Sequence, residues 1–526
     1  MNPPPATVPK NHFSTAAVLL YVGCLALFIA IFLHAWVTED AYISFRVVDN
    51  FIHGHGLRWN IDERVQVYTN PLWLLLHIPF YALFGHIFIV TLALSFLCSI
   101  ITVFLAISIF PKRPFLAFSA FIFPFLLSKA LLEYSTSGLE NPLSFLFFIL
   151  FCFILFRKQT ENIPWFSLSL ITALAAWNRL DNIIVYAPIM TYLIVSHIKQ
   201  VQWGKLALGT APLVVWELFS LIYYGFLFPN TKYAKLHTGI SQSDYFLQGL
   251  YYICDFLLKD TVSACLVILG IALGIMHLIY AALTPKDRNT GILASIGISL
   301  LLYCIYVVTV GGDFMSGRFW TMPILMSAFL LYATLSLKKA SWQIGGLVIL
   351  CLLGIRIDWH YHIEPELPNT LLSGIADEWH FYYETNTLVQ FNQSLSLRSA
   401  IENQGAGFRI YPFGETVDHH PVIVMGNIGM YGYYHPNELI IDYNALTDPL
   451  LARLPITDTK HWRIGHFERP IPEGYVHARK TGSTEMMAPA LADYYQQLRE
   501  VTSGPLFSVK RFHAIAELNL HNPPEF

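Results

Sequence analysis

The stretch that decides the fold is residues 14–46, STAAVLLYVGCLALFIAIFLHAWVTEDAYISFR. Residues 14–36 are almost wholly apolar, and a helix needs about 20 such residues to cross a bilayer. The run is too long for the apolar core of a signal peptide and lacks a clear small-residue cleavage site, so it predicts an uncleaved membrane anchor. The acidic pair Glu39-Asp40 follows directly, which places two carboxyl groups at the membrane surface.

The composition of the whole chain agrees with a membrane protein. Of 526 residues, 13% are charged and 55% are hydrophobic, whereas a soluble domain carries about 25% charged residues. These values exclude a disordered protein, a disulfide scaffold and a soluble enzyme. The net charge of −3 gives no sign of a nucleic-acid partner. The sequence therefore predicts a polytopic α-helical membrane protein.

The charges divide the chain into two parts. Residues 1–356 hold 21 basic and 15 acidic groups, and residues 357–526 hold 11 basic and 20 acidic groups in less than half the length. We expect a transmembrane module over 1–356, with a first outer loop at 37–86, and a soluble domain over 357–526. That domain is predicted to be α/β or β-rich, because residues 422–425 and 438–441 are typical of short buried strands around a Gly/Tyr-rich turn.

The apolar runs predict eleven spans, and the basic loops predict their orientation. Lysines and arginines near 10, 112–113, 157–158, 199–205, 286–288 and 338–339 all fall on one side of this scheme, which indicates the cytoplasm. Residues 71–84 are apolar but too short to span, so we expect an interfacial or re-entrant helix; a twelve-span topology is the alternative. The predicted spans are 14–36, 87–110, 114–132, 140–156, 164–178, 182–198, 206–226, 261–283, 291–310, 320–337 and 342–356.

The first outer loop carries the leading candidates for catalysis. Thr38 is expected to cap a helix over about 41–52, whose apolar residues recur at helical spacing. Glu39 and Asp40 then lie in its first turn, where the helix dipole stabilises their ionised forms. An ionised acid at the membrane surface can act as a general base. The alternative is that both are simply favourable first-turn residues.

Four further polar clusters fall on the same outer face. Glu140 begins a predicted span and is either functional or a partner for the helix dipole. Arg179 either pairs with Asp181 or binds an anion. The cations of the remaining two clusters either hold a phosphate through charge-assisted hydrogen bonds or reach toward lipid headgroups. These clusters are residues 134–142, 178–182, 228–235 with Lys232 and Lys235, and 311–320 with Asp313 and Arg318.

Nucleotide-binding motifs and zinc-type Cys/His spacings do not occur in the sequence. The His419-His420 pair and the other scattered histidines are more typical of solvated or structural positions than of metal ligands. Outward-facing acids and cations without a nucleotide site indicate a substrate carried by lipid.

Taken together, these loops resemble the GT-C superfamily of integral membrane glycosyltransferases. The likeness is greatest to the terminal arabinofuranosyltransferase type of mycobacterial cell-wall arabinan, and it runs from about residue 37 to 475. Where the family often has two aspartates this chain has Glu39-Asp40, and Arg179-Leu180-Asp181 replaces a small-x-x-Pro-Glu pattern, which leaves the role of Asp181 open. The matching segments are residues 39–46, 54–60, 68–73, 137–143, 229–235, 311–318, 429–433, 441–449 and 462–466.

The resemblance implies inversion at the anomeric carbon and a sugar carried on a polyprenyl phosphate, and the terminal arabinofuranosyltransferase type implies that this sugar is a pentofuranose. The acceptor would be a cell-envelope glycan at the outer face of the bacterial inner membrane. Asp40 would be the general base and Glu39 an orienting residue, with divalent-metal assistance left open. Arg318, Lys232 and Arg179 would bind the donor phosphate. Supporting residues would be Asp313, Glu140, His55 and Arg58, and the aromatics expected to bind the acceptor are Tyr431, Tyr433 and Tyr434.

Two other classes of protein compete with this hypothesis. A transporter or flippase often shows internal repeats with broken helices near the midplane, but the sequence has no convincing repeat and its notable polar groups gather at one surface. A non-catalytic, virulence-associated envelope assembly protein would not need an acid pair and cationic loops on the same face.

Overall fold

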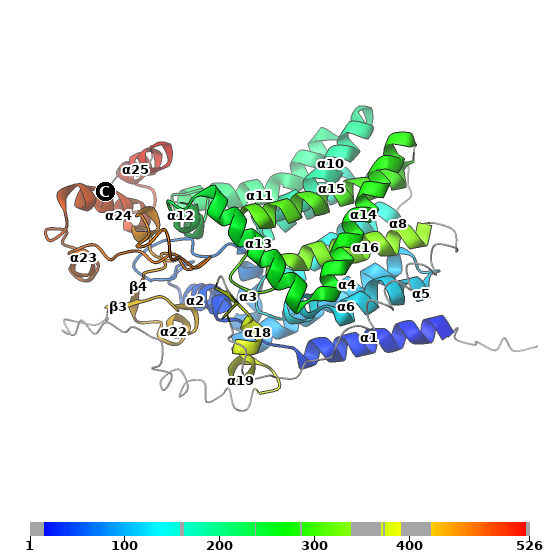
Figure 1. Cartoon of the computed structure of the whole chain (residues 1–526). Helices are drawn as coiled ribbons and strands as arrows, with labels where there is room; N and C mark the ends of the chain where they lie inside the picture. Colours follow the sequence, from blue (N-terminus) through cyan, green and yellow to red (C-terminus); the bar gives the residue numbers. More distant parts are fainter. Residues whose placement is uncertain are drawn as a thin grey trace, which may run out of the picture.

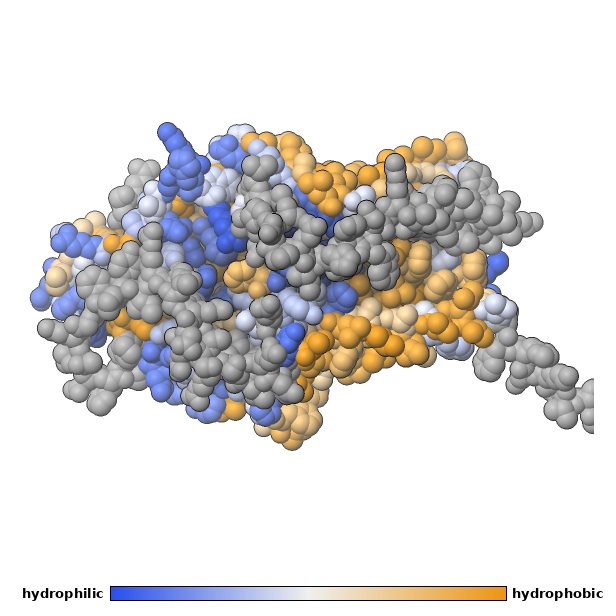
Figure 2. All heavy atoms as spheres, turned by 60° about the horizontal axis from the view of Figure 1, so that its bottom comes forward, coloured by the Kyte–Doolittle hydropathy of each residue, from blue (hydrophilic) through white to orange (hydrophobic). Residues whose placement is uncertain are grey.

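The computed structural model describes residues 15–157, 162–236, 238–284, 287–337, 370–371, 374–390 and 422–521. Within these ranges the chain is mainly helical, and long helices lie side by side in a bundle with a smaller α/β cap at one end (Figure 1). Hydrophobic side chains form a band over the bundle, and hydrophilic side chains gather over the cap (Figure 2). This is the architecture of a multi-pass membrane protein with a water-exposed region.

Six helices of the described residues are long and apolar enough to span a bilayer. Shorter apolar helices complete the bundle. The six are α1 (Thr15–Leu33), α4 (Ile87–Ile109), α11 (Trp203–Tyr223), α14 (Thr261–Leu283), α15 (Arg288–Thr309) and α16 (Thr321–Leu337), which extends a 3₁₀ turn at Arg318–Trp320. The shorter ones include α3 (Pro71–Phe84), α8 (Asn141–Arg157), α9 (Trp165–Asn178) and α10 (Ile183–Ser196).

The predicted spans correspond to these helices with one difference. Residues 114–132 are not one helix but α5 (Pro114–Ala117), a π-helical turn (Phe118–Ile122), α6 (Phe123–Leu127) and α7 (Lys129–Glu133). Ser128 lies between the last two with extended backbone, and its hydroxyl accepts a hydrogen bond from the Leu131 amide. The predicted span at 342–356 and the domain boundary at 356–357 lie outside the described residues.

The helices pack as membrane helices do, with small residues where backbones approach. On α1, the buried positions Leu20, Gly23, Leu27 and Ile31 recur every three to four residues and leave the other faces exposed. Between α14 and α15, Gly274 and Gly297 face each other so closely that a Cβ on Gly274 would lie 2.7 Å from the Cα of Gly297. Close van der Waals packing of this kind holds helices together in a membrane, because lipid gives no hydrophobic driving force for their association.

Two helices connect the bundle to the cap. The helix α2 (Glu39–Ile52) has most of its residues buried, because it packs against α3 on one side and against α22 (Gly429–Tyr434) on the other. Thr38 occupies the predicted N-cap position, but its side chain does not cap the helix; its hydroxyl instead donates to the Glu378 Oε2 atom at 3.4 Å. The predicted 14-residue segment 71–84 is α3, and Gly85 ends it with a φ of +72°.

The cap contains the two predicted strands, but it is richer in helix than in strand over the described residues. Strands β3 (Val422–Met425) and β4 (Leu439–Asp442) are parallel, with Val422 opposite Leu439, and the expected Gly/Tyr-rich turn between them is the helix α22. A second pair, β1 (Thr370–Leu371) and β2 (Ile375–Ala376), is antiparallel. The other helices of the cap region are α18 (Glu378–Phe381), α19 (Tyr383–Asn386), α23 (Tyr475–Thr481), α24 (Pro489–Ser503) and α25 (Val509–Leu520). Before them in the chain, α12 (Asn230–Leu236) contacts the cap, and α13 (Gln242–Lys259) packs against α14 and α15 of the bundle.

Buried polar contacts join the cap to the adjoining end of the helix bundle. Arg479 forms a bidentate pair with Glu63 at 2.8 Å, and both side chains are only 3% exposed. Arg511 donates to the backbone oxygens of Ile222 and Tyr223 at the end of α11. Because these donors would be left unsatisfied without their acceptors, the cap depends on the adjoining ends of the membrane helices for its own structure.

Candidate functional site

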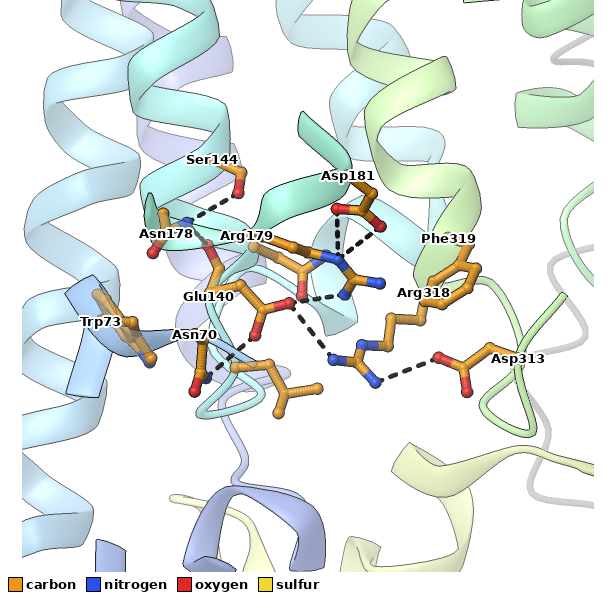
Figure 3. A network of polar contacts seen from close by, with 12 residues as sticks. Asn70, Trp73, Glu140, Ser144, Asn178, Arg179, Asp181, Asp313, Arg318 and Phe319 are labelled. Carbon is orange, nitrogen blue, oxygen red and sulfur yellow. Dashed lines mark hydrogen bonds and ion pairs between the residues drawn. The ribbon is translucent and has the colours of Figure 1, made fainter. Parts of the chain in front are cut away.

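A network of ion pairs joins loops at the end of the helix bundle that adjoins the cap (Figure 3). The Glu140 Oε1 atom contacts Arg179 Nη1 at 2.7 Å and Arg318 Nη2 at 3.4 Å. Arg179 also contacts Asp181 at 2.8 Å, and Arg318 contacts Asp313 at 3.2 Å. Arg179 therefore forms the ion pair with Asp181 that the sequence offered as one alternative, Glu140 is a second partner, and two arginines are held by three carboxylates.

Glycine in the connecting loops lets these side chains converge. Gly138 has a φ of +84°, and a Cβ there would lie 2.8 Å from the Ala41 Cβ atom and 2.9 Å from a Val37 methyl group. The loop that carries Glu140 consequently packs against the first turn of α2. Gly317, with a φ of +78°, similarly allows the turn that presents Arg318.

Asp40 lies in the first turn of α2, where the sequence predicted it, and is half-buried. The pKa of Asp40 is raised overall, chiefly by burial and further by Asp313, whereas Arg318 and Lys235 act in the opposite direction. The two cations, together with the helix dipole, favour the ionised carboxylate that a general base requires. Asp40 therefore lies near Arg318 and Asp313 of the network, although it belongs to a different element, α2.

Glu39 is in the same helical turn but has a different environment. Its Oε1 atom accepts hydrogen bonds from the backbone amides of Gly429 and Met430 in α22. Burial, with Asp40 as the next cause, raises the pKa of Glu39 to about 8. Glu39 is therefore held by the α22 amides, which agrees with the orienting role expected for it and leaves Asp40 as the candidate base.

The two lysines of α12 also have different environments. The Lys232 ammonium lies 3.1 Å from the centre of the Phe228 ring. The pKa of Lys235 is lowered, chiefly because its ammonium is removed from water, and the charges of Asp313, Arg318 and Asp40 also act on it. Lys235, rather than the predicted Lys232, is the lysine that lies among the charged groups of the site.

Two residues of the cap region join the site without having been predicted as site residues. Arg463 acts electrostatically on Asp40, and its Nε atom donates to the Gly374 carbonyl at 2.8 Å. Glu378, at the start of α18, is 9% exposed and lies near Asp40 and Asp313. The motif around Trp462 could have indicated Arg463, whereas no sequence pattern distinguished Glu378 from the other acids of its region.

The tyrosines predicted to bind an acceptor are largely engaged in packing. Tyr433 is within hydrogen-bond distance of Tyr81, 3.0 Å between the hydroxyls, and its ring packs edge-on against Tyr42. Tyr431 stacks on His435 with 4.1 Å between ring centroids. Tyr434 is the most exposed of the three, at 36%, so it alone meets the expectation of an exposed aromatic.

The predicted supporting residues His55 and Arg58 do not join the network. Both lie beyond the far end of α2 from Asp40, and a 14-residue helix is about 20 Å long. His55 is exposed, and Arg58 donates to the Ile61 carbonyl at 2.8 Å. As for metals, the part of the chain that the structure describes contains no group of three or more His, Cys, Asp or Glu side chains placed to hold an ion.

Comparison with known proteins supplies two relatives. The chain is 24% identical over 525 aligned residues to the terminal β-(1→2)-arabinofuranosyltransferase of Mycobacterium tuberculosis, covering 83% of this chain and 81% of that protein. It is 26% identical over 324 residues to the protein of the same name from Corynebacterium glutamicum, covering 55% of this chain and 46% of that protein. The match therefore spans less than half of the corynebacterial relative. No family model matches the chain.

Among solved structures, ArnT from Cupriavidus metallidurans bound to undecaprenyl phosphate is similar over 63% of this chain and 62% of that chain, with 12% identity and a TM-score of 0.41. The resemblance to the terminal arabinofuranosyltransferase type, drawn from short loop motifs, is confirmed by the two relatives.

Proposed function

We propose that this protein is an inverting GT-C glycosyltransferase that moves a pentofuranose from a polyprenyl phosphate to a glycan of the cell envelope. The observation that carries the proposal is a carboxylate, Asp40, facing Arg318 and Lys235 at the junction of bundle and cap. The names of the two relatives support the sugar. The undecaprenyl phosphate named in the ArnT structure is a lipid of the class proposed here as the carrier.

The chemistry of such a transfer fits these side chains. Asp40 takes the proton of an acceptor hydroxyl as its oxygen attacks the anomeric carbon from the face opposite the phosphate, which inverts that carbon. The bond between the anomeric carbon and the phosphate oxygen breaks, and its electron pair leaves with the phosphate. A phosphate leaving group needs little protonation, so one base is sufficient, and cations compensate the charge that develops on it.

The ion pairs of the network suit Arg318 to this role. Its guanidinium is only 11% exposed and is held between Glu140 and Asp313. A cation that is already fixed does not have to reorganise when charge develops in the transition state, and this preorganisation is the main source of electrostatic catalysis. Lys235 forms no ion pair with the described residues, so its ammonium is available to a phosphate.

The described residues also form an apolar pocket that suits a lipid chain. It has a volume of about 360 Å³ and opens between α13, α14 and α15. Trp320, two residues after Arg318, contributes to its wall, as do Phe256, Ile268 and Ile305. A polyprenyl chain in this pocket would bring its phosphate toward Arg318, so the donor would bind across the boundary between lipid and water.

We further propose that the cap and Asp40 face the exterior of the inner membrane. The basic loops predict this orientation. Nucleotide-sugar donors are confined to the cytoplasm, and a lipid-linked donor is the form in which an activated sugar can serve an outward-facing site. Residues 1–356 would then be the catalytic membrane module, and residues 357–526 the outer domain that covers it.

Transfer by the purified protein tests the proposal. The substrates are a synthetic polyprenyl-phosphate arabinofuranose and an arabinan oligosaccharide. Asp40→Asn keeps size and polarity but removes the proton acceptor, so turnover should fall at least about a hundredfold, the scale of general-base removal. The matched variant Glu39→Gln should lose much less, because Glu39 is largely neutral already. Near-normal turnover in Asp40→Asn would exclude it as the base, and wild-type protein without transfer would exclude the proposed activity.

A further inference from the structure

The segment 374–390 connects the two halves of the site. On one side, the Ala376 backbone exchanges hydrogen bonds with the loop that carries Asp313 and Arg318: its amide donates to the Phe314 carbonyl at 2.7 Å, and its carbonyl accepts from the Ser316 amide at 2.9 Å. On the other side, the Asn386 carbonyl accepts from the Val37 amide at 3.1 Å. Backbone bonds to both sides fix this segment between the cationic loop and the start of α2.

Side chains of the same segment reinforce its position. Asp377 pairs with Lys129 at 3.0 Å and caps α18 by accepting from the His380 amide at 3.1 Å. The Trp379 indole donates to the His34 carbonyl at 3.1 Å, at the outer end of α1. Glu378 lies between these two anchored residues, so its carboxyl has a defined place beside the site.

The Glu378 carboxyl can form more hydrogen bonds than the described residues supply, and charged groups surround it. Its Oε2 atom lies 3.4 Å from the hydroxyl of Thr38, two residues before Asp40. No other hydrogen bond to the Glu378 side chain comes from the described residues, and it forms no ion pair with them. Burying a carboxyl that has only one weak hydrogen bond destabilises the folded protein, unless a further group binds that carboxyl.

We propose that Glu378 is a sugar-binding residue of the active site, donating a hydrogen bond from its neutral carboxyl to a hydroxyl of the sugar held beside Asp40. This inference rests on the proposed function. It assigns the two carboxyls of the site different roles: Asp40 accepts the proton, and Glu378 orients the substrate.

The surroundings favour the neutral form. Burial raises the pKa of Glu378 to about 8, with Asp40 as the largest charged contributor and Arg463 acting in the opposite direction. Two carboxylates in one partly buried site repel each other, so only one of them ionises readily. The charged and titratable groups around Glu378 are Asp40 and Glu39 on α2, Tyr134 before α8, Asp313 in the loop before α16, Tyr382 after α18, and Arg463 in the cap.

The pH dependence follows from this assignment. Below about pH 8 the carboxyl carries its proton and can donate a hydrogen bond. As the pH rises through that value the proton is lost, and a second negative charge appears next to Asp40 and the incoming phosphate. The rate of transfer should therefore fall on the alkaline side. Glu378→Gln keeps a donor that does not ionise, so the fall attributable to Glu378 should disappear.

The test measures kcat/KM for the purified full-length protein between pH 6 and 9.5, in wild type, Glu378→Gln and Glu378→Ala. We expect Glu378→Gln to be close to wild type at pH 7 and to stay active at pH 9. Glu378→Ala should be roughly three- to tenfold slower at pH 7, the loss of one hydrogen bond between neutral groups. Glu39→Gln is the matched control, because Glu39 has a similar pKa but faces the α22 amides.

Several results would overturn the assignment. An alkaline fall that persists in Glu378→Gln but vanishes in Glu39→Gln would transfer the titration to Glu39. Full activity in Glu378→Ala would show that no substrate contact is made. Thermal unfolding should be unchanged in Glu378→Gln, which reproduces a neutral carboxyl; an unfolded variant would contradict a neutral Glu378. These outcomes concern an active wild type, whereas a wild type without transfer would refute the proposed function itself.

Discussion

Replacing Glu140 by Gln is the most demanding test of the charged network. Its carboxyl is only 1% exposed, pairs with both Arg179 and Arg318, and accepts from the Asn70 side-chain amide at 3.2 Å. Removing one partner of a buried ion pair destabilises a protein by about 3–5 kcal/mol. Since Arg179 keeps Asp181 and Arg318 keeps Asp313, we expect the lower end, about 3 kcal/mol, together with a marked loss of transfer as the arginines separate.

The measurement is the free energy of unfolding in mixed micelles, with thermal unfolding in detergent as a second readout. Asp181→Asn is the matched control, because it removes a charge from the same Arg179 but leaves the pair with Glu140 intact. We expect that control to lose about 1.5 kcal/mol, the lower value for a hydrogen bond to a charged group. If Glu140→Gln were as stable and active as wild type while Asp181→Asn unfolded, Glu140 would not be the centre of the network.

Three further predictions follow. Lys235→Gln should weaken binding of a polyprenyl-phosphate sugar roughly ten- to a hundredfold, corresponding to about 1.5–3 kcal/mol, while Lys232→Gln changes it little; equal effects, measured by calorimetry, would reject the distinction. In a cysteine-free background, an impermeant thiol reagent added outside should label a Cys at the exposed position 497 in α24 but not one at position 113, just before α5, because α24 and α5 lie at opposite ends of the molecule (Figure 1); the reverse pattern would invert the topology. Tyr434→Ala should raise the KM for the glycan acceptor without lowering the unfolding temperature, whereas Tyr433→Ala should lower that temperature by removing the contact with Tyr81; an unchanged KM in Tyr434→Ala would remove Tyr434 from the acceptor site.

Much of the fold could be predicted because apolar length is a strong signal in membranes. The segment 71–84 was distinguished from a span by its length, and it is a helix with those bounds. The strands predicted at 422–425 and 438–441 correspond to β3 (422–425) and β4 (439–442), so the second prediction was displaced by one residue. The break within 114–132 was not predicted, because a π-helical turn satisfies its backbone with ordinary apolar residues and leaves no mark on hydropathy.

The site was harder to predict, because its geometry depends on which way side chains point. Lys232 and Lys235 are three residues apart on one short helix, and composition gave no reason to prefer either. Glu39 and Asp40 are neighbours, but consecutive residues on a helix face directions about 100° apart, so one contacts α22 and the other the arginines. Glu378 lies more than 300 residues after Asp40 in the chain, a separation over which a single sequence carries no pairing signal.

This dependence on distant segments limits how the cap can be studied. Deleting the chain after residue 357 would remove Glu378 and Arg463 from the site, and it would leave Glu63 without Arg479 in a buried pair. Loss of transfer in such a truncation would therefore say nothing about acceptor binding, because the membrane part would itself be damaged. Point substitutions at exposed positions of the cap, such as Tyr434, separate recognition of the glycan from assembly of the site, and the argument for an acceptor-binding cap has to be tested there.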